Sequence, residues 1–194
     1  MSIFDLLFIA LFLASVATLW TAAVQAIRGK GGLRILRRWA ICAGVYMAIV
    51  CAVALAKPQK LLKIGDLRCF DDWCIAVAGV EHAVAENNDS LCNVRLQISS
   101  QAKRVTQRAN GAYVYLTDAD GRRFDPLPDA AETPLDVMLT PGQMVEARRV
   151  FKLPADARDV GLVVVHGGSY CFPGCFIIGD EANPLGKRTV VRLP

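Results

Sequence analysis

The stretch "LCNVRLQISS", residues 91–100, decides the fold class of the longer part of this 194-residue chain. Its apolar side chains occupy every second position, at Cys92, Val94, Leu96 and Ile98. Because successive side chains of a strand point to opposite faces, this alternation is typical of a β-strand with one buried face. We therefore predict a strand here, with Cys92 on its apolar side as a buried free thiol.

Short runs of the same kind lie on both sides of this stretch. They are "WCIAVAGVE" from residue 73, "AYVYLTD" from 112, "PLDVMLT" from 134, "QMVEARRVFKL" from 143, "VGLVVVHGG" from 160 and "RTVVRL" from 188. Turn sequences separate them, for example "DADG" at 118–121 and "TPGQ" at 140–143. About seven short strands divided by turns predict an antiparallel β-sandwich over residues 65–194.

The order "ISS", "VYLTDADGRRFDP" and "LTPGQMVEARRVFKLPADARDVGLVV" resembles the immunoglobulin-like sandwich domains of the secreted mycobacterial immunoprotective-antigen type. The resemblance extends from about Trp73 to Val165 and includes related anchored bacterial domains of unknown function. It implies an extracytoplasmic accessory or interaction domain and supplies no catalytic residues. The chain departs from the pattern in its cysteines and in the segment "GGSYCFPGCFIIGDEANPLGKR", residues 167–188.

Two long uncharged runs precede the strands. They are "LLFIALFLASVATLWTAAVQAI" at residues 6–27 and "WAICAGVYMAIVCAVALA" at residues 39–56. Each is long enough to cross about 30 Å of hydrocarbon, so we predict two transmembrane helices, at about 3–27 and 39–57. The first is not expected to be a cleaved signal, because Asp5 is the only charge before Arg28. A linker at 58–64 would lead to the sandwich.

The loop predicted at residues 28–38 carries the charge that sets the topology. It contains five basic residues and no acidic one: Arg28, Lys30, Arg34, Arg37 and Arg38. Such loops stay in the cytoplasm, which places residues 65–194 in the periplasm or outside the cell, on a membrane that we expect to be a bacterial inner membrane. Lys57, Lys60 and Lys63 favour the opposite orientation. The basic excess lies beside lipid-spanning runs, so nucleic-acid binding is not expected.

Small residues recur at every fourth position in both apolar runs. They are Ala10, Ala14, Thr18, Ala22 and Ala26 in the first, and Gly44, Ala48, Ala52 and Ala56 in the second. Residues four apart share one helix face, and small ones allow two helices to approach closely. This pattern predicts a tight hairpin, although alanine is also simply common in such helices.

Four clustered cysteines are the most distinctive chemical feature: Cys69 and Cys74 in "CFDDWC", and Cys171 and Cys175 in "CFPGC". In an oxidising compartment such pairs usually form disulfides, and the four cysteines allow three connectivities. Reduced thiols, or a metal or redox site, are the alternatives.

The metal hypothesis has one specific form, because two helices before a sandwich with a late C-x3-C resembles cytochrome oxidase subunit II and its binuclear copper centre. The matching ligand positions hold Gly179, Ala182 and Asp136 instead of histidine and methionine. Copper of that type needs imidazole and thioether ligands, so we predict no metal and no cofactor. Redox or copper handling remains the alternative function.

The sequence as a whole predicts a membrane-anchored interaction or scaffolding domain without catalysis. It contains no phosphate-binding glycine loop, H-E-x-x-H or G-x-S-x-G motif and only two histidines. The "DADG" sequence is a hairpin turn rather than a calcium loop, since its glycine comes too early. The expected partners are the lipid bilayer and another envelope protein or a second copy of the chain.

Overall fold

The computed structural model describes residues 3–29, 32–84, 89–128, 133–167, 173–181 and 183–194. The chain forms two compact units. The helical unit consists of Met1–Pro58 with Cys171–Lys187, and the sandwich unit consists of Gln59–Tyr170 with Arg188–Pro194. The late segment that departs from the sandwich pattern therefore belongs with the helices, although more than 100 residues separate it from them in sequence.

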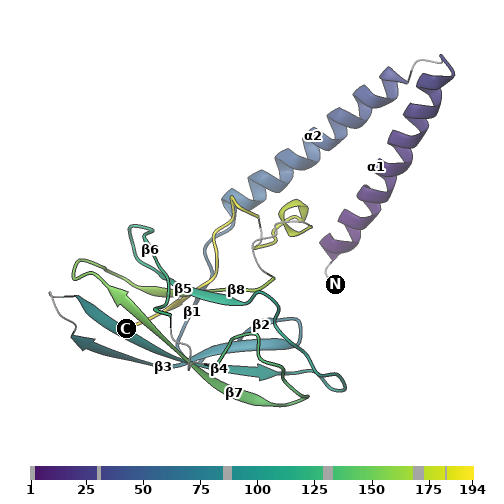
Figure 1. Ribbon diagram of the computed structural model, residues 1–194. Helices are drawn as coiled ribbons and strands as arrows, with labels where there is room; N and C mark the ends of the chain where they lie inside the picture. The colour runs from purple at the N-terminus through teal and green to yellow at the C-terminus, as the bar shows by residue number, and fades with distance from the viewer. Residues whose placement is uncertain (1–2, 30–31, 85–88, 129–132, 168–172, 182) are drawn as a thin grey trace. The chain divides into compact units, whose positions relative to one another are not determined.

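The helical unit contains α1 (Ile3–Ile27) and α2 (Leu33–Ala56), and both are long and apolar enough to cross a membrane (Figure 1). The second helix begins at Leu33 rather than near residue 39, so the predicted loop at 28–38 is too long. Arg34, Arg37 and Arg38 lie in its first two turns. Leu and Arg are good helix formers, so the helix extends beyond the uncharged run that marked its predicted start.

Close packing between α1 and α2 occurs next to the loop that joins them. Ala22 is buried there, and a Cβ atom added to Gly32 would overlap the carbonyl oxygen of Ala22. The other residues of the predicted packing set are exposed, namely Ala10, Ala14, Gly44, Ala48 and Ala52. Of the predicted packing set, Ala22 is the buried member, and the helices are closest where the loop joins them (Figure 1). A role of the whole stripe in helix packing stays a prediction.

The sandwich unit contains two sheets. One has the strand order β1 (Leu61–Leu62), β9 (Val190–Arg192), β8 (Gly161–Val165), β5 (Tyr113–Thr117) and β6 (Arg123–Phe124). The other has the order β2 (Arg68–Phe70), β3 (Trp73–Val84), β4 (Ser90–Ser100) and β7 (Met144–Leu153). All pairs are antiparallel except β1 with β9. The predicted fold class, two apolar helices followed by an antiparallel β-sandwich, is confirmed.

In two segments the structure differs from the prediction made from the sequence. The run at 134–140 forms no strand in the described residues and makes only an isolated bridge between Leu139 and Gln107. The predicted linker at 58–64 contains β1, which pairs in parallel with β9. A two-residue strand has no periodicity, so only its partner reveals it.

The core lies between the two sheets. Strand β4 contributes Cys92, Val94, Leu96 and Ile98, each fully buried, as its alternation predicted. Leu116 and Leu162 of the opposite sheet pack in the same cluster. Removing this apolar surface from water is the main stabilising term of such a fold.

The "DADG" turn joins β5 to β6 as a hairpin. The buried Asp118 carboxylate accepts hydrogen bonds from the backbone N–H of Asp120 at 3.1 Å and of Arg122 at 2.9 Å. The Arg122 guanidinium donates to Asp118 at 2.7 Å and to Asp156 at 2.8 Å. The carboxylate that resembled a calcium ligand therefore holds the turn together.

Candidate functional site

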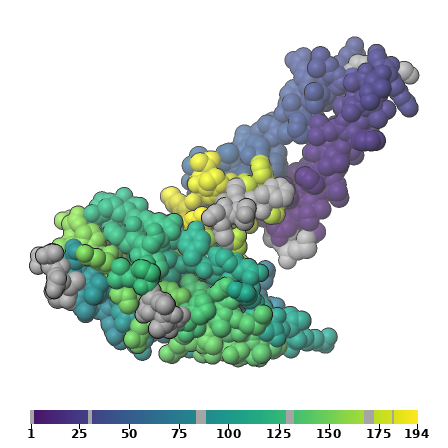
Figure 2. Space-filling view, viewed as in Figure 1, coloured from purple at the N-terminus to yellow at the C-terminus, as the bar shows by residue number. Residues whose placement is uncertain are grey.

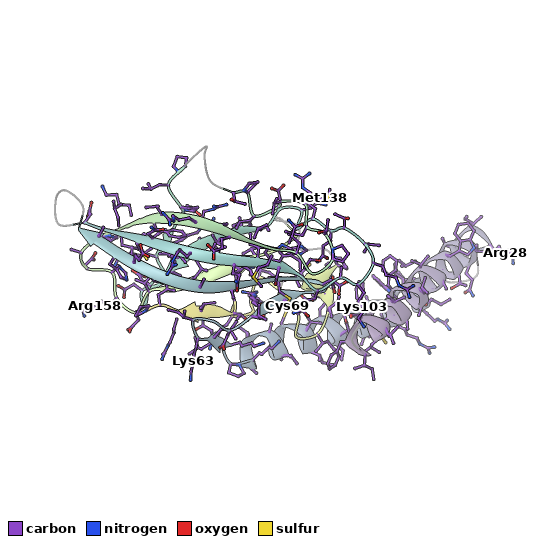
Figure 3. All side chains as sticks on the ribbon, turned by 90° about the horizontal axis from the view of Figure 1, so that it is seen from below. Arg28, Lys63, Cys69, Lys103, Met138 and Arg158 are labelled. Atoms are coloured by element: carbon purple, nitrogen blue, oxygen red, sulfur yellow. A yellow bond between two sulfur atoms is a disulfide. The ribbon has the colours of Figure 1, made fainter. Side chains whose placement is uncertain are left out.

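The sulfur chemistry of the sandwich unit is concentrated in the turn between β2 and β3. Cys69 and Cys74 are directly opposite in the strand register and are joined by a disulfide (Figure 3). Asp71, in the turn between them, has φ of 54°, a left-handed conformation that aspartate tolerates better than most residues. The disulfide therefore closes a short local hairpin and leaves the other cysteine cluster to pair elsewhere.

An aromatic cluster surrounds this hairpin and connects the two sheets. Phe70 and Trp73, on either side of the turn, contact His166, which follows β8 of the other sheet; the ring centroids are 5.2 Å and 5.7 Å from that of His166. The Arg68 guanidinium lies 4.7 Å from the Phe70 ring centroid and donates to the carbonyl oxygen of Thr189 at 3.1 Å. His166 is therefore part of an aromatic stack rather than of a ligand set.

The second predicted cysteine cluster is described only in part. Cys175 is disulfide-bonded, and Cys171 lies outside the described residues. Because Cys69 pairs with Cys74, a bridge from either of them to the late cluster is excluded. The long cross-link between the two clusters, which two of the three connectivities would have made, is therefore excluded.

The copper and redox alternative is not supported. A copper centre needs thiolates, and the Cys69 and Cys74 sulfurs are bonded to each other. Asp136 forms an ion pair with Arg108, and Ala182 lies outside the described residues. Among the described residues no group of three or more His, Cys, Asp or Glu side chains could hold a metal ion.

Cys92 is a free thiol in the sandwich core and is fully buried. Desolvation by burial raises its pKa to about 11 from the ordinary value of 9.0. Since the thiolate is the reactive form of cysteine, this side chain behaves as a small apolar residue.

The late segment of the helical unit, Cys171–Lys187, covers one face of α2 with its described residues. The Tyr46 hydroxyl donates to the carbonyl oxygen of Phe176 at 2.7 Å, and the Lys57 ammonium donates to that of Gly179 at 2.6 Å. Val50 and Ala54, which lie between these anchors on the same helix face, are buried. Figure 2 shows the segment in yellow beside the blue helix. The short 3-10 helix Gly174–Phe176 is thus held against α2.

A cavity of about 610 Å³ lies where this segment meets the two helix ends. Its apolar lining comes from α1, α2 and the late segment: Phe4, Val53, Ala56, Ile177 and Ile178. Among the described residues, the lining also includes Gly179 and the charged residues Asp5, Lys57 and Asp180. The sequence alone does not predict this site, because its parts are more than 100 residues apart. The apolar "FII" in an otherwise polar excursion was the available signal.

The predicted topology residues lie at the opposite end of the helical unit. Arg28 directly follows α1, while Arg34, Arg37 and Arg38 lie in the first turns of α2. Lys30 is outside the described residues. The basic residues therefore gather where the helices are joined.

No family model matches the sequence, and no curated protein matches it. Several solved structures are similar. An uncharacterized β-sandwich protein from Clostridium difficile is 13% identical with a TM-score of 0.44, and the match covers 71% of this chain and 96% of that one. The secreted protein MPT63 of Mycobacterium tuberculosis is 11% identical with a TM-score of 0.41, with coverage of 55% and 90%. The YjhA protein of Bacillus subtilis is 12% identical with a TM-score of 0.40, with coverage of 69% and 99%. These similarities assign no activity to the chain.

Proposed function

We propose that the chain is a membrane-anchored interaction protein. Its two helices span a bacterial inner membrane and hold the sandwich outside the cytoplasm, where the sandwich binds another envelope protein without catalysis. The observation that carries this proposal is the Cys69–Cys74 disulfide in a domain that follows two apolar helices of 25 and 24 residues. Structural disulfides persist in oxidising compartments and are rare in the cytosol.

The charge distribution supports the same orientation. Arg28, Arg34, Arg37 and Arg38 lie at the end where the helices are joined. Short basic segments beside spanning helices stay in the cytoplasm. A helix of 24 residues is about 36 Å long, so α2 can span the hydrocarbon and still place its first basic residues at the headgroups.

The outward face of the four-stranded sheet supports a binding role. Arg95 on β4 and Arg148 on β7 are direct cross-strand partners. Like charges in this arrangement destabilise a sheet. Arg95 lies 3.7 Å from Glu81, whereas Arg148 is exposed and has no ion pair with the carboxylates that the structure describes. A partner surface with carboxylates would offset this repulsion.

The compartment is tested by the state of the cysteines in cells. Whole cells are denatured in a thiol-alkylating reagent without reductant, and the peptides are analysed by mass spectrometry. We expect Cys69 and Cys74 to remain linked and unalkylated until a reductant is added. Cys92, which is free, is the internal control and should be alkylated in both samples. Alkylation of Cys69 and Cys74 before reduction would place the domain in a reducing compartment and contradict the proposal.

The binding role is tested by charge reversal. Full-length protein is extracted in mild detergent, and the size of its complex is compared for Arg148→Glu and for the matched control Arg158→Glu. Arg158 is also exposed but lies between β7 and β8, away from the Arg95 pair. We expect only Arg148→Glu to release the partner, because like charges across an interface cost several kcal/mol. A complex that survives both changes, or a wild-type protein that is always alone, would contradict the assignment.

A further inference from the structure

We propose that the late segment is a re-entrant membrane element, in which residues 173–178 enter the bilayer beside α2 and contact its acyl chains. This inference rests on the proposed function, because the segment meets acyl chains only if α1 and α2 span a bilayer. It adds a third membrane element to the two helices that the sequence indicates.

The connections of the late segment fix how it can enter the membrane. It follows β8, which ends at Val165, and precedes β9, which begins at Val190, and both strands belong to one sheet of the sandwich unit. Between them, Cys171–Lys187 belong to the helical unit. A segment whose two flanks lie in one folded domain cannot cross the bilayer. If it enters the bilayer, it therefore enters and leaves at the same surface.

The bond from Tyr46 sets the depth of the segment. The Tyr46 hydroxyl donates to the carbonyl oxygen of Phe176 at 2.7 Å. Tyr46 precedes Ala56, the last residue of α2, by ten positions, which is about 15 Å along the helix axis. A centred helix of about 36 Å extends only about 3 Å beyond each side of a hydrocarbon layer of about 30 Å. The Phe176 carbonyl therefore lies at the depth of the acyl chains.

The charged part of the segment lies nearer the surface. Lys57 directly follows α2, and its ammonium donates to the carbonyl oxygen of Gly179 at 2.6 Å. Lysine side chains at the ends of spanning helices place their ammonium groups at the interface. Asp180 and Glu181 follow Gly179, whereas residues 173–178 carry no charge. The change from apolar to charged sequence thus coincides with the level at which α2 ends.

Hydrogen bonds within the protein satisfy much of the backbone of the segment. An irregular backbone is tolerated at membrane depth only where the protein supplies partners for its polar groups. The side-chain amide of Asn183, a residue with only 5% of its surface exposed, donates to the Cys175 carbonyl oxygen at 3.1 Å. In the described part of the segment, carbonyl oxygens accept hydrogen bonds at Pro173, Gly174, Cys175, Phe176, Ile177, Gly179 and Asp180.

Phe176 provides the contact with lipid. It is 37% exposed although it is large and apolar, and its carbonyl is held beside Tyr46. Val45 and Ile49, which lie next to Tyr46 in α2, are 57% and 47% exposed. Contact with water is unfavourable for such side chains, whereas contact with acyl chains is not. The segment and this part of α2 therefore present the same kind of surface to their surroundings.

Lipid contact is measured on full-length wild-type protein in phosphatidylcholine vesicles that contain an apolar diazirine probe. After illumination, the labelled residues are identified by mass spectrometry. We expect residues 173–178 to carry about tenfold more label than Val105, an exposed apolar residue of the sandwich, because an apolar probe concentrates in hydrocarbon. Trp20, which is 73% exposed on α1, is the reference for a spanning helix. Label at Trp20 but not at residues 173–178 contradicts this inference alone, whereas label at neither contradicts the proposed function.

Two pairs of variants test which residues hold the segment in the bilayer. Phe176→Arg should reduce the labelling of residues 173–178 about tenfold, because arginine is costly in hydrocarbon. Val105→Arg is the matched control and should leave it unchanged. Tyr46→Phe should also reduce it, since the Phe176 carbonyl loses its donor, whereas Tyr113→Phe on β5 should not.

The thermal transition of the sandwich is recorded for every variant, and an unchanged transition shows that the variant is folded. Folded Phe176→Arg protein that is labelled as strongly as wild type would overturn the inference, because a side chain in water accepts this charge without cost.

Discussion

Cys69 and Cys74 occupy opposite positions on β2 and β3 and are joined by a disulfide across a separation of five residues. A loop this short restricts the unfolded chain only slightly in comparison with a long cross-link. The bridge therefore fixes a hairpin, together with the Phe70 and Trp73 rings beside it, and does not tie the two ends of the sandwich together.

Removal of this disulfide should have a moderate effect on stability. We expect the double substitution Cys69→Ser with Cys74→Ser to lower the free energy of unfolding by about 2 kcal/mol, from the chain entropy of a loop of about six residues. Thermal unfolding of the full-length protein in detergent, followed by near-ultraviolet circular dichroism, measures the change. Cys42→Ser, which removes an unbridged cysteine of α2, should leave the transition unchanged. An equal shift in both variants would show that the bridge adds nothing.

Burial of Cys92 should make its thiol slow to react. It should also make the stability of the fold decline at alkaline pH. Its pKa is raised to about 11 by burial, so the folded thiol stays neutral where the unfolded thiol, with a pKa of 9.0, ionises. The thiolate fraction at neutral pH is then lower by about a hundredfold, and alkylation of the folded protein should slow at least as much relative to the unfolded chain.

The pH dependence of stability follows from the same shift. As the pH rises, the Cys92 thiol loses its proton in the unfolded state before it does so in the folded state. Its contribution to the free energy of unfolding is therefore complete below pH 9 and declines as the pH rises to about 11. Cys92→Ala should remove this part of the alkaline decline. Denaturation midpoints measured between neutral and alkaline pH test the prediction, and identical slopes for wild type and Cys92→Ala would contradict it.

Features of the fold that depend on residues close together in the chain could be predicted from the sequence. Period-two alternation identified β4 because Val94, Leu96 and Ile98 report one buried face without reference to any other segment. The "DADG" turn was equally local, since Asp118 bonds to the backbone N–H groups of the next few residues. Interactions within about ten residues can be read from the order of side chains.

The features that the sequence did not reveal are long-range. β1 pairs with β9 across 129 positions, as Leu61 with Val190, and two residues carry no periodic pattern. Tyr46 and Lys57 hold a segment that is more than 120 residues away. The stripe at Ala10, Ala14 and Gly44 stays a prediction for helix packing, because small residues permit close packing but do not determine which partner covers them.

Protonation of Asp118 should weaken the β5–β6 hairpin. Burial opposes its ionisation, but hydrogen bonds from Arg122 and from the backbone of Asp120, together with the Arg122 charge, outweigh it and lower the pKa. A lowered pKa means that this contribution is present above the unfolded value of about 3.9 and is lost as the pH falls through the folded value.

Asp118→Asn should therefore be less stable than wild type at neutral pH, and its stability should fall less steeply in acid. Asp120→Asn is the control, because its exposed carboxylate is only 3.9 Å from the Arg122 guanidinium. Thermal transitions recorded from pH 7 to pH 3 measure both effects. If the transition temperatures of wild type and Asp118→Asn fell in parallel across this pH range, protonation of Asp118 would not contribute to the loss of stability in acid.

The alternation of apolar and polar side chains along β4 predicts that substitutions at neighbouring residues have very different effects on stability. Leu96 has no exposed surface and lies in the core between the sheets, while Gln97 points to the other face of β4. Leu96→Ala should lower the free energy of unfolding by about 2–5 kcal/mol, because it removes buried methyl groups and leaves a cavity. Gln97→Ala should change it by no more than about 0.5 kcal/mol. Denaturant unfolding of the full-length variants in detergent measures both values, and similar losses at the two positions would mean that the predicted face of β4 is not the buried one.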